Sequence, residues 1–240
     1  MKYACITDIG LMREKNQDSY LLSTNNFDDL LAIVCDGIGG GLAGEVASSE
    51  IVKYFNNSFK DTAKFETYEM MNEYLENNII LANNHVRDLS RSYREYRGMG
   101  TTLTGVLIAG EKILSINCGD SRVYGFLDKK IFHLTNDHTL VNQMLENKEI
   151  TIEEAKNHPK KHYLVRAMGI FEDANVDIHQ VKDMEYFLLC SDGLHGLVSD
   201  NEIKDVVYSN GELQEKVEAL KNLALLKGGS DNITIILIER

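Results

Sequence analysis

The sequence has a single proline, four cysteines and no tryptophan among its 240 residues. Without a Pro/Ser-rich stretch, we see no linker, low-complexity tract or internal repeat, so one domain covering residues 1–240 is the simplest interpretation. The cysteines lie in apolar runs without Cys-x-x-Cys spacing, which favours buried thiols in a reducing compartment over zinc or a disulfide framework. They are Cys5, Cys35, Cys118 and Cys190.

Basic residues are scarce, with 25 Lys and Arg against 37 Asp and Glu and a net charge of -12. Nucleic acid and anionic membrane surfaces repel such a chain on average, although a bound cation can still attract an anionic substrate locally. Long apolar runs are also absent. Asp8 interrupts the first one, so no signal-peptide core is present, and none approaches the roughly 18 residues of a membrane span. We therefore expect a cytoplasmic protein without membrane insertion.

Short runs rich in Ile, Leu, Val and aromatic residues predict strands, and apolar residues spaced three and four apart predict helices. The predicted strands are Tyr3–Ile9, Leu30–Cys35, Thr102–Ala109, Lys112–Asn117, Arg122–Leu127, Ile131–Leu134, Asn175–Gln180, Tyr186–Cys190 and Ile233–Ile238. The predicted helices are Ala43–Phe55, Phe65–Glu95, Leu140–Asn147, Ile152–Lys156, Asn201–Tyr208 and Leu213–Leu226. Thr151 and Glu154 form a capping-box pattern at one helix start. Close strand spacing between residues 102 and 134 favours antiparallel pairing, and the whole pattern indicates an α+β layered domain.

Four aspartates, Asp36, Asp120, Asp192 and Asp231, each lie at one end of a strongly apolar run. One such aspartate alone is best explained as a turn cap. If the strands share a sheet edge, however, the four carboxylates converge, and their mutual repulsion raises each pKa. A divalent cation removes that penalty, and oxygen ligands without a His/Cys cluster indicate Mg²⁺ or Mn²⁺ rather than Zn²⁺.

The segment from Asp36 to Gly41 is rich in glycine, which allows close backbone approach. The carbonyl of Gly37 could therefore bind a metal, although a flexible turn into the next helix explains the same residues. A P-loop is excluded because the Gly-Lys-Ser/Thr ending is absent. Arg13 has a planar guanidinium group that can contact two phosphate oxygens at once, although by composition alone it would be a solvated surface residue.

Segments spread from residue 10 to residue 234 resemble, in the same order, the metal-dependent Ser/Thr protein phosphatases of the 2C type (the PPM family), especially its compact bacterial members. The matching segments are Arg13–Asp18, Val34–Glu45, Gly98–Leu103, Gly119–Tyr124, Asp137–Thr139, His158–Pro159, Leu164–Gly169, Ser191–Leu194 and Ser230–Thr234. A single Asp-Gly pair would carry no weight, but the complete ordered set is specific to this family.

The resemblance implies a four-layer α/β/β/α sandwich of two antiparallel sheets flanked by helices. It also implies a ligand set for two divalent cations, Mn²⁺ or Mg²⁺. In that set Asp36 bridges the two metals, Asp192 and Asp231 are further ligands, and Gly37 contributes its backbone carbonyl. Asp120 matches a residue that helps to hold a third, weaker metal in bacterial relatives.

Two more roles are implied outside the ligands. Arg13 resembles the phosphate-binding arginine, and Asp18 resembles a group that orients the water on the metals. Residues from about 138 to 169 match a mobile flap beside the active site. The implied reaction is the hydrolysis of phosphoserine and phosphothreonine by metal-activated water, without a phosphoenzyme. The implied partners are phosphorylated proteins, including a cognate Ser/Thr kinase and its substrates, and a monomer is the default state.

The sequence departs from the family pattern at a few positions, none of which removes an implied ligand. Ile38 replaces a histidine proposed as general acid in many eukaryotic relatives. Gly41 replaces a histidine common in bacterial relatives, Gln17 a frequent glutamate, and His195-Gly196 a frequent Thr and Asp.

Two alternatives to this function stay open. A pseudophosphatase or phosphoprotein-binding regulatory module would keep the fold without turnover, but the intact aspartates argue against it. An aspartyl-phosphate hydrolase would use Asp36 as nucleophile, but that chemistry usually needs a second aspartate where Ile38 stands.

Overall fold

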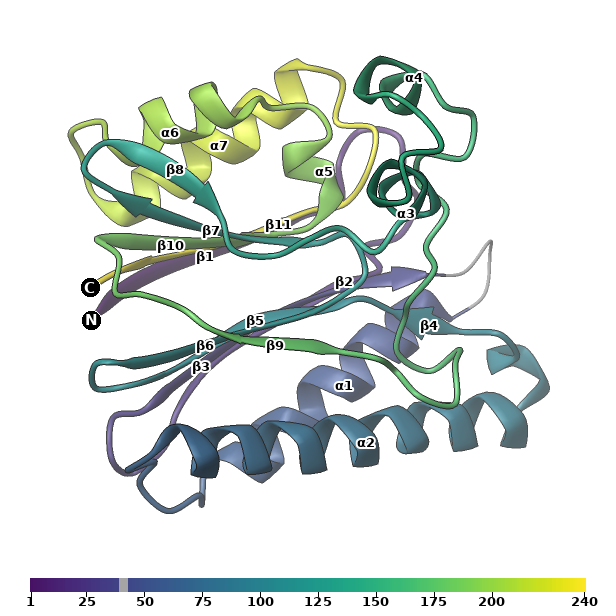
Figure 1. Ribbon diagram of the computed structural model, residues 1–240, viewed down its shortest axis with the longest axis vertical. Helices are drawn as coiled ribbons and strands as arrows, with labels where there is room; N and C mark the ends of the chain where they lie inside the picture. The colour runs from purple at the N-terminus through teal and green to yellow at the C-terminus, as the bar shows by residue number, and fades with distance from the viewer. Residues whose placement is uncertain (39–42) are drawn as a thin grey trace.

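The structure, a computed structural model, describes residues 1–38 and 43–240 and contains two antiparallel sheets stacked face to face (Figure 1). Gly39, Gly40 and Gly41 of the glycine-rich segment lie outside the described residues. The first sheet has the strand order β1 (Lys2–Asp8), β11 (Ile233–Glu239), β10 (Tyr186–Cys190), β7 (Arg122–Leu127) and β8 (Lys130–His133). The second has the order β2 (Asp18–Thr24), β3 (Leu30–Ile38), β5 (Leu103–Ala109), β6 (Lys112–Cys118) and β9 (Asp177–Gln180), with β4 (Gly100–Thr101) beside the end of β3.

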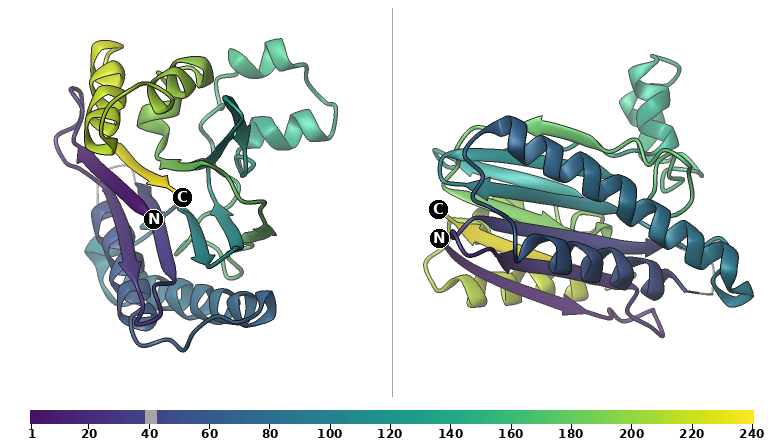
Figure 2. Two further views of the ribbon diagram at one scale, coloured as in Figure 1. Left: turned by 90° about the vertical axis from the view of Figure 1, so that its left-hand side faces the viewer. Right: turned by 90° about the horizontal axis from the view of Figure 1, so that it is seen from below.

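Helices cover the outer face of each sheet, which confirms the expected sandwich of two antiparallel sheets flanked by helices (Figure 1). The second sheet is covered by α1 (Gly44–Phe59) and α2 (Tyr68–Ser92), and the first by α5 (Asp192–His195), α6 (Asp200–Val207) and α7 (Leu213–Leu226). A short 3-10 helix, Arg94–Tyr96, follows α2. Figure 2 shows α3 (Leu140–Glu146) and α4 (Ile152–Lys156) standing apart from these layers at one end of the molecule.

Strand β3 shows why two sheets can stack here. Successive side chains of a strand point to opposite faces. Leu31 and Ile33 pack in the cluster under α1 and α2, whereas Leu30 and Ala32 pack in the cluster between the sheets. Because both faces of β3 are buried, its sequence is a continuous apolar run rather than an alternating one.

Helix boundaries follow local signals in the chain. Helix α2 begins after Thr67, whose side chain accepts a hydrogen bond from the backbone N–H of Met70. The predicted capping box at the start of α4 is present, with Thr151 and Glu154 each accepting from the other's backbone N–H. No helix in the described residues combines the length and the apolar character needed to cross a membrane.

Some expectations about the elements were wrong. Sequence reasoning missed β2, the two-residue β4 and the four-residue α5, and it ended the strand of Asp36 too early, since Asp36 lies inside β3. Strand β2 mixes polar and apolar residues and depends on its pairing with β3, in which Asp18 stands opposite Asp36. The cysteines are free thiols, with Cys35, Cys118 and Cys190 buried and Cys5 partly buried.

Candidate active site

The four aspartates come together in a cleft of about 270 Å³ at one end of the sandwich. Asp36 belongs to β3 of the second sheet, whereas Asp192 starts α5 just after β10 of the first. Asp231 stands two residues before β11, and Asp120 lies in the connection from β6 to β7, which crosses between the sheets. The carboxylates therefore converge across two sheets, and the shared sheet edge considered from the sequence is not how they meet.

Asp36 and Gly37 are held by backbone contacts that leave little freedom. The N–H of Asp36 donates to Thr102 Oγ1 at 2.8 Å, and its carbonyl accepts from the N–H of Thr102 at 2.9 Å. A Cβ atom on Gly37 would lie 2.4 Å from the carbonyl oxygen of Gly44, so only glycine fits. Gly37 also lines the cleft, so its position there depends on the absence of a side chain.

Asn232 attaches the loop of Arg13 to the start of β11. Its Oδ1 accepts from the N–H of Gln17 at 2.8 Å, and its Nδ2 donates to the carbonyls of Ile9 at 2.9 Å and Lys15 at 3.0 Å. Asn232 belongs to the family motif Ser230–Thr234, but its positioning role was not predicted from the sequence. The available signal in the sequence was the side-chain amide of Asn232 next to Asp231, because an amide can both donate and accept hydrogen bonds.

Arg13 reaches the cleft from this loop and pairs with a predicted metal ligand. Its Nη2 donates to Asp231 Oδ2 at 2.6 Å, and this bond raises the pKa of Arg13, together with attraction from Asp231, Asp192 and Asp36. Both side chains are partly exposed, so the guanidinium lies at the rim of the cleft.

Asp18 lies behind the cleft rather than in its lining. Ser191 Oγ donates to Asp18 Oδ2 at 2.7 Å and itself accepts from the N–H of Thr234 at 3.0 Å. The other oxygen, Oδ1, is buried and has no hydrogen-bond partner. Burial, with repulsion from Asp192 and Asp231, raises the pKa of Asp18 to about 7.

The carboxylates destabilise one another electrostatically. Burial and the charges of neighbouring aspartates raise the pKa of both Asp36 and Asp120 well above the usual range, and burial with Asp231 raises that of Asp192 to about 6. Asp192 Oδ1 is also buried without a partner. Unpartnered oxygens among crowded like charges fit a site built for cations, since a divalent ion supplies the missing positive charge.

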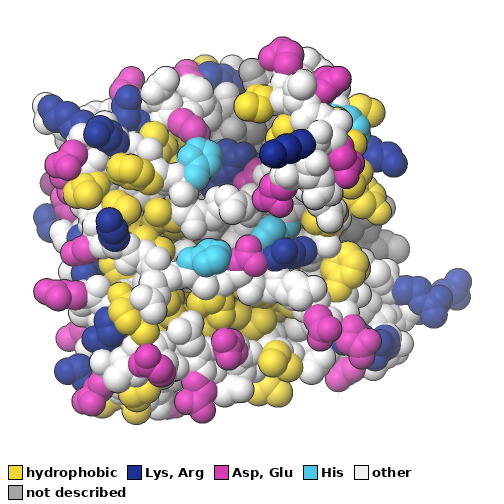
Figure 3. All heavy atoms as spheres, in the orientation of Figure 1, with side chains coloured by type: hydrophobic (Ala, Val, Ile, Leu, Met, Phe, Trp, Pro, Cys, Tyr) yellow, Lys and Arg dark blue, Asp and Glu magenta, His cyan; other side chains and the backbone are white. Residues whose placement is uncertain are grey.

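On the face that Figure 3 draws, the negative charge is dispersed. Figure 3 shows acidic and basic side chains interspersed over the visible face, with hydrophobic side chains between them. The concentration of carboxylates in the cleft is therefore not a simple consequence of the net charge of -12.

Two histidines that sequence reasoning did not place in the site lie next to its aspartates. His195 Nε2 donates to the backbone carbonyl of Asp120 at 2.9 Å, and burial lowers its pKa to about 4, so the ring is a neutral donor at neutral pH. The departure at 195–196 is thus accommodated by a helical turn, in which the N–H of Gly196 donates to the carbonyl of Asp192. His162 Nδ1 lies 4.0 Å from Asp192 Oδ2.

Residues 138–169 are attached to the site at both ends. The N–H of His138 donates to the carbonyl of Gly119 at 2.8 Å, and the N–H of Gly119 donates to His138 Nδ1 at 3.2 Å. At the other end, Met168 and Thr101 exchange two backbone hydrogen bonds. His162 and Leu164 of this segment line the cleft, and Figure 1 shows its helices α3 and α4 at one end of the two sheets.

Comparison with known proteins gives consistent matches along the chain. The family described as Protein phosphatase 2C matches residues 13–225. The serine/threonine phosphatase stp of Listeria welshimeri is 36% identical over 236 residues, covering 98% of this chain and 94% of that protein. The crystal structure of Stp1 from Staphylococcus aureus has a TM-score of 0.94 and 34% identity, covering 100% of this chain and 94% of that one. A PstP catalytic domain, solved with two manganese ions, has a TM-score of 0.84 and 31% identity, covering 99% of this chain and 97% of that one.

These matches define a class of metal-dependent phosphoprotein hydrolases with this double-sheet fold. The chain belongs to the protein phosphatase 2C family of serine/threonine phosphatases. The family resemblance derived from the sequence is thereby confirmed, together with the fold and the enzyme class.

Proposed function

We propose that this chain hydrolyses phosphoserine and phosphothreonine in proteins with two divalent cations, Mn²⁺ or Mg²⁺, held in the cleft. Asp36, Asp192 and Asp231 would hold them, together with the carbonyl of Gly37. The observation that supports this most directly is the crowding of carboxylates in the cleft, with the buried Oδ1 of Asp192 lacking any hydrogen-bond partner. Among the described residues that line the cleft, Arg13 is the only Lys or Arg side chain, so cations are needed to balance the charge.

Bound divalent cations would supply a Lewis acid and lower the pKa of water toward neutrality. Arg13 would bind the phosphoryl oxygens, because its guanidinium can exchange Asp231 Oδ2 for another anionic oxygen while it stays at the rim of the cleft. Asp18 would orient water through Oδ1, the oxygen that no protein group occupies, while Ser191 fixes Oδ2. Ile38 lines the cleft and has no proton to donate, so it cannot act as general acid toward the leaving alkoxide.

A third, weaker cation would lie at Asp120, which has fewer carboxylate neighbours available because Asp36 and Asp231 serve the first two. Residues 138–169 would act as the mobile flap of a single catalytic domain covering residues 1–240. We further propose a cytoplasmic monomer that opposes a Ser/Thr kinase. The free thiols Cys35, Cys118 and Cys190 support a reducing compartment.

Peptide kinetics test the proposed reaction. Phosphoserine and phosphothreonine peptides should be hydrolysed with Mn²⁺ and not in excess chelator, and a phosphotyrosine peptide of the same sequence should be turned over much more slowly. Binding of phosphopeptides without turnover at any Mn²⁺ concentration would instead support the regulatory module. Preference for phosphotyrosine, or full activity in chelator, would refute the proposal.

A further inference from the structure

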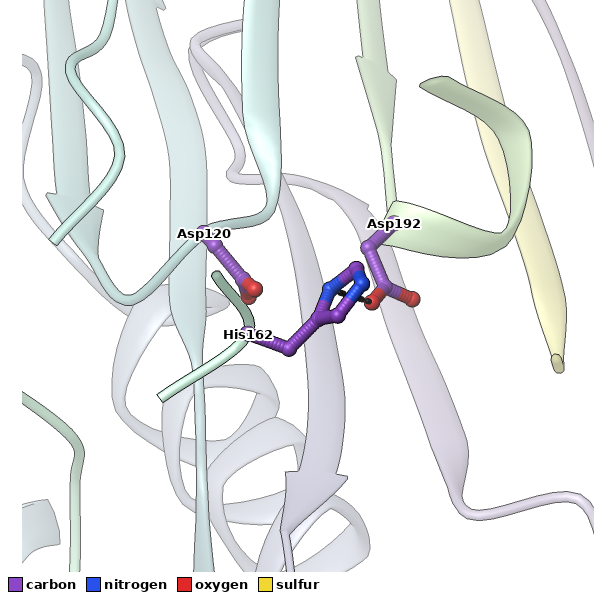
Figure 4. Close-up of side chains that lie close together, drawn as sticks. All are labelled: Asp120, His162 and Asp192. Carbon is purple, nitrogen blue, oxygen red and sulfur yellow. Dashed lines mark ion pairs between the residues drawn. The ribbon is translucent and has the colours of Figure 1, made fainter. Parts of the chain in front are cut away.

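A histidine from residues 138–169 meets two of the site aspartates. One nitrogen of His162 and one carboxylate oxygen each from Asp120 and Asp192 all lie within 4.8 Å of one another. Figure 4 shows the three side chains directed toward a common point from three separate parts of the chain. His162 lies outside the family motifs, between His158–Pro159 and Leu164–Gly169.

The spacing suits one cation. Two ligands on opposite sides of an ion, each at about 2.1 Å, stand roughly 4.2 Å apart, and adjacent ligands stand closer. A small side-chain rotation would therefore bring all three into contact with the same ion. His162 can make that rotation, since its side chain is 68% exposed.

The aspartates of this cluster lack protein partners that would make a cation unnecessary. Asp120 is only 7% exposed, and no side chain in the described residues donates a hydrogen bond to its carboxylate. Asp192 Oδ1 is buried and unpartnered. The nearby Arg122 is already engaged, because its Nε and Nη2 donate to the two carboxylate oxygens of Asp137 at 2.8 and 2.6 Å.

We propose that His162 is a protein ligand of the third cation, completing a site with Asp120 and Asp192. This inference rests on the proposed function, because it adds a ligand to the site at Asp120. Imidazole suits Mn²⁺ better than Mg²⁺, which prefers oxygen ligands and retains its waters. The site should therefore discriminate between the two ions, unlike one made of carboxylates and water alone.

The test compares H162A with the wild type and with H158A, which removes another flap imidazole outside the cluster. At saturating Mn²⁺, electron spin echo spectra of the wild type should show nitrogen coupling from a directly bound imidazole. H162A should lose it and H158A should keep it. In Mn²⁺ titrations, H162A should weaken only the third site, by about tenfold or more, while two tight ions remain. Mg²⁺ affinity at the third site should change much less.

Unchanged third-site Mn²⁺ affinity and retained nitrogen coupling in H162A would overturn the inference, as would equal losses for Mn²⁺ and Mg²⁺. Two tight ions and normal peptide hydrolysis in those same samples would show that the proposed function survives. A wild-type protein that binds no Mn²⁺ and hydrolyses no phosphopeptide would refute the proposed function itself. Thermal unfolding of H162A in chelator controls for folding, and it should match the wild type because His162 is a surface residue.

Discussion

Arg13 Nη2 donates to Asp231 Oδ2 at 2.6 Å, although the two residues are 218 positions apart in the sequence. The bond gives one predicted metal ligand a cationic partner while its neighbours Asp36 and Asp192 have none of comparable strength. Arg13 and a cation therefore compete for the same carboxylate. The guanidinium is at once the phosphate-binding candidate and a group that metal binding would release.

The first prediction follows from that competition. R13A should lower kcat/KM for phosphopeptides by about 10–100-fold, which corresponds to the loss of a charge-assisted hydrogen bond. Mn²⁺ affinity should stay the same or rise, because Asp231 loses its competitor. K15A is the matched control, since Lys15 lies on the same loop but pairs with Glu45. A fall in Mn²⁺ affinity in R13A would contradict this account, and titration of Mn²⁺ with both variants decides it.

The second prediction concerns stability without metal. In chelator at pH 8, D36N should unfold at a higher temperature than the wild type, because it removes one of several carboxylates that are crowded together in the cleft and repel one another. A gain of about 1 kcal/mol would raise Tm by about 2–4 °C in a chain of this size. With Mn²⁺ the order should reverse, since a ligand at 100 times its Kd stabilises the wild type by about 2.7 kcal/mol and D36N loses a ligand.

D28N serves as its control, because Asp28 is an exposed residue in the turn between β2 and β3, at the opposite end of β3 from Asp36. It should leave Tm unchanged with and without Mn²⁺ and retain activity, whereas D36N should be inactive. If D36N destabilised the protein in chelator, Asp36 would be a structural residue, and the idea of mutual repulsion would fail.

A third prediction uses the pKa of Asp18, which burial raises to about 7 from an ordinary value near 3.8. The folded protein then binds this proton more tightly than the unfolded chain, so the free energy of unfolding falls as pH rises from about 4 to about 7. D18N has no such proton to lose. In chelator, the Tm of D18N relative to the wild type should therefore increase across that interval and level off above it. A difference that is flat with pH would show that Asp18 does not titrate there.

The fourth prediction separates two roles for Asp120. D120N should retain two tightly bound Mn²⁺ ions but lose phosphopeptide turnover more steeply than turnover of an aryl phosphate. Ser and Thr alkoxides are poor leaving groups and need a proton, whereas an aryl oxide leaves without one. Ile38 lines the cleft but has no proton to donate. We expect the two losses to differ by about tenfold or more, within the range of general acid catalysis. Equal and mild losses on both substrates, with metal content measured in parallel, would leave Asp120 as a turn-capping residue.

Local signals were sufficient for much of the fold. Helices α4 and α7 and strands β7 and β10 have the bounds expected from the sequence, because capping residues and apolar periodicity act over a few neighbouring positions. Strand β2 carried no comparable signal. Asp18 and Ser23 are buried in it although both are polar, because pairing with β3 fixes the strand, and Asp18 also accepts a hydrogen bond from Ser191.

The sequence by itself determined the family and the kinds of group at the site, because aspartates and glycines at the ends of apolar runs recur in one specific order. Only the tertiary structure decided that Asp36 faces Asp192 and Asp231 from the opposite sheet. It also decided that Arg13 pairs with Asp231, and that His162 approaches Asp120. These relations depend on how two sheets stack and on where a long connection returns. Both are set by packing between residues far apart in the chain, which no local pattern encodes.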